Sequence, residues 1–122
     1  MSGTTSGVNI TQSGEDINLQ IYRGKTLNFN IIWGGSTPID ITGFQASLQA
    51  QALDGDVLLV LDTGNGGIII DGASGKLSFK ANSVLTEQVN KPGRYELEMT
   101  NLSGDVYRVI SGSIAPIEEI VQ

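Results

Sequence analysis

Residues 22–48, YRGKTLNFNIIWGGSTPIDITGFQASL, decide the fold class of this chain. Apolar side chains occupy every second position from Leu27 to Trp33, the only tryptophan, and again from Phe44 to Leu48. Between the two runs lies a Gly-Gly-Ser-Thr-Pro segment that is typical of a turn. Because successive side chains of a strand point to opposite faces, this pattern predicts two half-buried strands joined by a loop. Such a pair indicates an all-β protein.

The same two-residue period continues on both sides of this stretch. It predicts further strands over residues 16–22, 57–61, 68–70, 76–80, 94–100 and 106–114. Turn residues separate the strands, as Asp54 and Gly55 do in one predicted hairpin. About eight strands at a spacing of roughly ten residues are typical of a sandwich or barrel. We expect an immunoglobulin-like antiparallel β-sandwich, without the cysteine pair of antibody domains because the chain has no cysteine.

One short helical turn is predicted after the strand at residues 76–80. Ser83 is the candidate N-cap, and a Pro-Gly pair at residues 92–93 ends the segment. Between them, Val84, Leu85 and Val89 are spaced for one face of a helix. The segment has room for about two turns at most.

The chain is expected to divide into an arm, one domain and a tail. Its 122 residues are the length of a single domain that buries a core without metal or disulfides. Residues 1–14 are rich in Ser, Thr and Gly and predict a flexible N-terminal arm, which is either a free terminus or a tether that orders against a neighbouring subunit. The β-sandwich domain is expected over residues 15–115. Residues 116–122 form an apolar and acidic C-terminal tail, which is either a docking element or a last edge strand.

The composition argues against an enzyme. The chain contains no histidine and no cysteine, so Ser-His-Asp triads, thiolate nucleophiles and zinc sites with His or Cys ligands cannot form within it. We expect no catalytic residue, no metal site and no bound cofactor. The net charge of −6 opposes binding to nucleic acid. No segment approaches the roughly 18 apolar residues that span a bilayer, so a membrane is not an expected partner.

Three polar patterns have a structural explanation that outweighs the functional one. Gly24, Lys25 and Thr26 copy the end of a phosphate-binding loop, but a leucine stands where the upstream glycine is required. Glu96 and Glu98 share one face of a strand, which is typical of a solvent-exposed face and not of two carboxylates that flank a substrate. Four aspartates in turns are predicted to be solvated, with a loop calcium site as the alternative: Asp54, Asp56, Asp62 and Asp71.

Residues 57–61, Val-Leu-Leu-Val-Leu, are apolar on both faces of a predicted strand. Such a strand is either central in a sandwich or part of a subunit contact. Together with apolar residues of the two termini, it supplies the candidate interface residues, which are Val8, Ile10, Val57, Leu59, Ile117, Ile120 and Val121.

Four segments of the chain resemble a known family. They are residues 22–29 (YRGKTLNF), 37–44 (TPIDITGF), 66–75 (GGIIIDGASG) and 93–98 (GRYELE). Together they resemble small bacteriophage and prophage virion proteins, and they are similar to the N-terminal domain of siphophage upper baseplate proteins. The resemblance covers about residues 20–115 and leaves the predicted arm and the last residues outside it.

This resemblance implies a building block of the virion without enzymatic activity. Such a protein is present in many copies and joins a tail, baseplate or collar to peripheral components, so the expected partners are other phage virion proteins and further copies of this chain. We expect an adaptor and not a host-recognition module, because no stalk or receptor-binding domain follows. Two alternatives stay open: a capsid cement or head-decoration protein, and a carbohydrate-binding module that stacks sugars on Trp33, Tyr22 and Tyr95.

Overall fold

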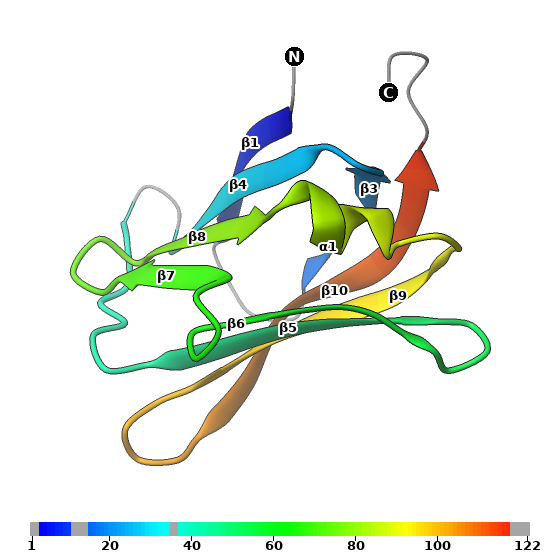
Figure 1. Cartoon of the computed structure of the whole chain (residues 1–122). Helices are drawn as coiled ribbons and strands as arrows, with labels where there is room; N and C mark the ends of the chain where they lie inside the picture. Colours follow the sequence, from blue (N-terminus) through cyan, green and yellow to red (C-terminus); the bar gives the residue numbers. More distant parts are fainter. Residues whose placement is uncertain (1–2, 11–14, 35–36, 118–122) are drawn as a thin grey trace.

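The computed structural model describes residues 3–10, 15–34 and 37–117, which form two β-sheets packed face to face (Figure 1). One sheet has the strand order β1-β4-β8-β7, and the other has the order β2-β10-β9-β5-β6, with β3 also paired to β10. The elements are β1 (Gly3–Ile10), β2 (Glu15–Asp16), β3 (Leu19–Tyr22), β4 (Thr26–Trp33), β5 (Gln45–Ala52), β6 (Val57–Asp62), β7 (Ile68–Asp71), β8 (Lys76–Ala81), α1 (Ser83–Glu87), β9 (Gly93–Thr100) and β10 (Val106–Ile117).

This arrangement confirms the predicted all-β sandwich class. In immunoglobulin domains, strands B, E and D lie side by side in one sheet, and strands C, F and G lie side by side in the other. Here β4, β8 and β7 occupy the first set of positions, β5, β9 and β10 occupy the second, and α1 lies in the connection between β8 and β9. The described residues contain more strands than predicted, because the segment at residues 15–22 is split in two and residues 3–10 add a strand.

Three strand pairings are parallel, which the sequence pattern did not predict. β1 runs parallel to β4, and both β2 and β3 run parallel to β10. A two-residue period assigns side chains to faces, but it carries no information on the direction of the partner strand. The segment before β4 therefore contributes a strand to one sheet and two strands to the other. Its first part lies within the range expected to be an arm, and the division of the chain into arm, domain and tail stays a prediction.

The core lies between the two sheets and is filled by the predicted alternating rows. In β4 every second side chain is buried, as it is in β5 and in β9. The rings of Phe29 and Phe79 stack across the β4–β8 pair, with their centroids 4.4 Å apart. The buried rows of these three strands are Leu27, Phe29, Ile31 and Trp33; Ala46, Leu48, Ala50 and Ala52; and Tyr95, Leu97 and Met99.

A bulge interrupts the alternation of buried and exposed residues in β10. The register between β9 and β10 shifts between Arg108 and Ile110, so that Val109 and Ile110 are both buried. Val106 and Arg108, which precede the bulge, are both exposed. One extra residue in a ladder reverses the faces on one side of it, and the apolar pattern does not reveal its position.

The short helix α1 has a different cap from the predicted one. Asn82 is the N-cap, since its Oδ1 accepts a hydrogen bond of 2.9 Å from the Leu85 backbone N–H. The assignment of Ser83 as N-cap is wrong, because Ser83 is already the first helical residue. On the predicted apolar face Val89 is buried and Leu85 is half-buried, whereas Val84 is 67% exposed.

Two of the segments that carry the family resemblance meet at one end of the sandwich. The Ile41 N–H donates to the carbonyl of Gly72, and the Trp33 N–H donates to the carbonyl of Gly75, each at 2.8 Å. Gly75 has a φ of +64°, and a Cβ atom there would lie 2.6 Å from the carbonyl oxygen of Ile39. Close approach of two backbones therefore requires glycine at this position.

Candidate docking surfaces

The β4 edge of the four-stranded sheet is occupied by β1. The two strands pair along the full length of β1 in a parallel ladder of eight residues. The register places Val8 beside Ile31 and Ile10 beside Trp33, and both of these β4 residues belong to the buried row. Within the described residues β1 pairs with no strand other than β4. The backbone ladder of this segment is therefore made with a single described strand.

The outer face of the six-stranded sheet is polar, as the alternation predicted. Arg108 Nη1 donates to Glu96 Oε2 at 3.2 Å, and more than half of each side chain is exposed, so this ion pair contributes little to stability. A shallow depression of about 630 Å³ lies over β5, β9 and β10. Its lining includes Ser47, Gln49, Gln51, Arg94, Glu96 and Arg108. Such a surface suits hydrogen bonding to a polar partner.

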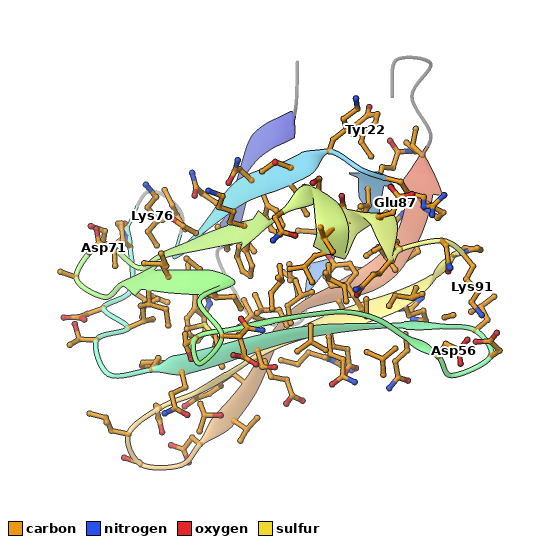
Figure 2. The ribbon with its side chains drawn as sticks, viewed as in Figure 1. Tyr22, Asp56, Asp71, Lys76, Glu87 and Lys91 are labelled. Atoms are coloured by element: carbon orange, nitrogen blue, oxygen red, sulfur yellow. The ribbon has the colours of Figure 1, made fainter. Side chains whose placement is uncertain are left out.

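An exposed apolar pair lies beside a charged cluster at the β5–β6 loop. Leu53 is 81% exposed and Val57 is 57% exposed. Lys91 Nζ donates to carboxylate oxygens of Asp54 and Asp56, each at 2.7 Å; Figure 2 labels Lys91 and Asp56 at this end of the molecule. These hydrogen bonds raise the pKa of Lys91 to about 12 and lower the pKa of Asp54 below its ordinary value. The cluster ties the loop to the segment that follows α1.

Of the two candidate interface residues in β6, only one is exposed. The register between β5 and β6 shifts so that Gln51 pairs with Val57, and Leu58 is the extra residue. As a result Leu58 and Leu59 are both in the core, each 3% exposed. Leu59 therefore offers no surface to a partner in this structure. Val57 lies on the edge strand of the sheet and remains a candidate.

The C-terminal candidates divide between a strand and undescribed residues. Ile117 is the half-buried last residue of β10, where it pairs with Tyr22 of β3. Its carbonyl accepts a hydrogen bond of 3.0 Å from the Arg23 N–H. The first two residues of the predicted tail thus continue a strand of the sheet. Ile120 and Val121 lie outside the described residues, so their role in docking stays a prediction.

Two of the three aromatic residues considered as sugar platforms lie in the core. Trp33 is 7% exposed and makes edge-to-face contacts with Phe44 and Tyr107. Tyr95 is 1% exposed, whereas Tyr22 is half-buried. A ring must present a free face to stack on a sugar, so the three aromatics do not form a platform.

The four turn aspartates do not converge on one point. Asp54 and Asp56 share Lys91, whereas Asp62 and Asp71 each accept a hydrogen bond from a residue three positions later in their own turn. Across residues 3–10, 15–34 and 37–117 no group of three carboxylate, His or Cys side chains is placed to hold a metal ion. In the same ranges, no helix has the length and apolar character to cross a membrane.

Exposed apolar residues at the hairpin ends were not among the predicted candidates. Leu102 is 85% exposed and Val106 is 59% exposed in the β9–β10 hairpin. Leu102 covers Gly43, where a Cβ atom would lie 2.8 Å from Leu102 Cδ1. A usable signal was present in the sequence, because both residues flank a Ser-Gly-Asp turn, and residues beside a turn lie at the surface. Leu53 flanks the Asp54 turn in the same way.

No family model and no curated protein matches the sequence. Among solved structures, the fold is similar to the N-terminal domain of phage TP901-1 ORF48. The TM-score is 0.49 and the sequences are 14% identical, over 95% of this chain and 99% of the other. This is a similarity of fold, and no function is inferred from it.

Proposed function

We propose that this chain is a non-enzymatic structural protein of a bacteriophage virion, an adaptor of the tail, baseplate or collar that docks peripheral components. The proposal rests on the positions of the four segments that resemble siphophage upper baseplate proteins. They contribute strands or turns to both sheets of one sandwich, and residues 37–44 and 66–75 are hydrogen-bonded to each other. The resemblance thus follows a packed unit and not isolated turns.

The edges and faces of the sandwich support a docking role. β1 is added to the sheet through a backbone ladder, which is the way in which extended segments of one protein bind the sheet edge of another. β6 and β7 each pair on only one side within the described residues, so further sheet edges are available. In an assembly of many copies, modest contacts of this kind add up to stable attachment.

The proposal assigns no catalytic group. The chain has no histidine, which is the side chain that most often acts as a general acid or base. On the outer face of the six-stranded sheet, Glu96 is paired with Arg108 and both side chains are open to solvent. An exposed ion pair of this kind, on a polar sheet face, suits recognition of a polar partner.

Immunolabelling of phage particles tests the proposal. Antibody raised against this chain is applied to particles and imaged by electron microscopy, with particles from a phage that lacks the chain as the control. We expect label on the tail, the collar or the baseplate. Label over the head would replace the adaptor by a capsid cement or head-decoration protein. Particles without label would contradict the assignment to the virion.

A further inference from the structure

We propose that the β4 edge is a strand-acceptor site for β1 of a second copy of this chain, so that neighbouring copies exchange their N-terminal strands. This inference deepens the docking role proposed above by naming the partner. It rests on the proposed function only for the high local concentration that an assembly provides.

The geometry of β1 makes such an exchange possible. β1 pairs with β4 alone among the described strands, and this ladder can form equally with β4 of another molecule. The register alternates between core-row partners such as Phe29 and outward partners such as Asn28, so every pairing made within one chain can be reproduced between two chains. Strand exchange between copies therefore loses no pairing.

The β4 edge needs an occupant. Ile31 and Trp33 of β4 are 0% and 7% exposed and lie in the strand directly beside β1. A strand edge next to a core row presents unpaired N–H and C=O groups, which are a template for another chain. The segment that fits this edge in register is Gly3–Ile10, and every copy of the protein carries one.

The interaction of β1 with the rest of its own chain is expected to be weak. Gly7 lies inside the strand, and glycine weakens a strand interior. Only Val8 and Ile10 have large apolar side chains. The segment also carries no charge, so its addition to a second chain of net charge −6 meets no direct repulsion between charged side chains.

Disulfide trapping between full-length chains tests the exchange. The natural chain has no cysteine, so each introduced thiol is unique. Thr5 pairs with Asn28 in the ladder, and neighbouring strands are about 4.8 Å apart, which is within the reach of a disulfide. Chains with Thr5→Cys and chains with Asn28→Cys, which carry tags of different size, are mixed at millimolar concentration under oxidising conditions. Cross-linked heterodimers are then measured on non-reducing gels.

The control pairs Thr5→Cys with Gln49→Cys, an exposed position on the other sheet that reports random collision. We expect at least about tenfold more heterodimer with Asn28→Cys than with Gln49→Cys, because pairing raises the effective concentration of the two thiols. A single chain with both Thr5→Cys and Asn28→Cys shows whether the ladder itself forms. Equal heterodimer yields from the two mixtures would overturn the exchange, whether or not the double variant closes its own disulfide. The assay uses no phage, so its failure leaves the virion proposal standing, and absence of label on particles leaves the exchange standing.

Discussion

Two glycines with the same backbone handedness differ in what surrounds them. Gly75 and Gly55 both have positive φ, at +64° and +96°. An added Cβ at Gly55 meets nothing within 4 Å, whereas at Gly75 it lies 2.6 Å from the Ile39 carbonyl oxygen and 2.9 Å from that of Trp33. Gly55→Ala is expected to lower the free energy of unfolding by about 1–2 kcal/mol, the cost of left-handed backbone.

Gly75→Ala is expected to cost about 3 kcal/mol or more, since the steric clash with two backbone oxygens adds to the cost of handedness. Urea denaturation of both variants measures the difference. Gly55→Ala is the matched control, because it carries the same change of side chain in the same region of φ. Equal losses for the two variants would show that the loop at Ile39 moves aside freely.

Tyr95 combines burial with a single hydrogen bond. It is 1% exposed, and its hydroxyl donates to the Ile17 carbonyl at 2.5 Å, which holds the segment between β2 and β3 against β9. Tyr95→Phe leaves the carbonyl without this donor and is expected to lower the free energy of unfolding by about 1–2 kcal/mol at neutral pH. Thermal or urea denaturation measures the loss.

Burial, with a smaller effect from the charge of Asp16, raises the pKa of Tyr95 above its ordinary value of 10.0. The unfolded chain therefore releases this proton at a lower pH than the folded chain does. The resulting stability is fully present below pH 10 and is lost as the pH rises from there toward the folded-state pKa. Stability above pH 10 is expected to fall less steeply in Tyr95→Phe than in the natural chain. Parallel curves would contradict this role of Tyr95.

At the scale of elements, α1 is short and depends on contacts at its ends. Thr86 is fully buried, and its hydroxyl donates to the Lys25 carbonyl at 2.8 Å, which joins the helix to the β3–β4 turn. Asn82→Ala removes the N-cap and is expected to cost about 1 kcal/mol. Ser83→Ala is the control and is expected to change stability by less than about 0.5 kcal/mol. Urea denaturation distinguishes the two, and a larger loss for Ser83→Ala would restore the sequence-based assignment.

The strands that were predicted best are those whose two faces meet different environments. β4, β5 and β9 each have a core face and an outer face, so their sequences alternate and the period identifies both the strand and its buried row. The β10 bulge at Arg108 and the extra residue Leu58 in β6 were not predicted, because each adds one residue without changing the apolar content of the run. The parallel edges were missed since they depend on the path of the chain between sheets.

The two interface candidates in β6 differ in burial, and their role in docking stays a prediction. Val57 was found from its apolar character and is exposed, but the same argument selected Leu59, which fills the core. Apolar character alone does not separate a residue that binds a partner from one that packs inside. The pairing of β1 with β4 was beyond sequence analysis, because Thr, Ser and Gly in residues 3–7 resemble a flexible terminus.

For the whole molecule, the proposed docking role requires that folding and assembly depend on different parts of the chain. The core side chains that the structure describes lie between Ile21 and Ile114. Deletion of residues 1–14 should therefore leave a folded sandwich that unfolds in one transition. It also frees the β4 edge beside a core row, so we expect faster aggregation at high protein concentration.

Incorporation into particles is expected to fall to background when residues 1–14 are deleted, because β1 is then absent from the assembly. Deletion of residues 1–2 alone is the control, since it leaves Gly3–Ile10 intact and should permit normal incorporation. Circular dichroism and a urea titration establish that each truncated chain is folded, and immunoblots of purified particles measure incorporation. Normal incorporation of the chain without residues 1–14 would show that attachment uses another surface, and the polar outer face of β5, β9 and β10 would then be the next region to alter.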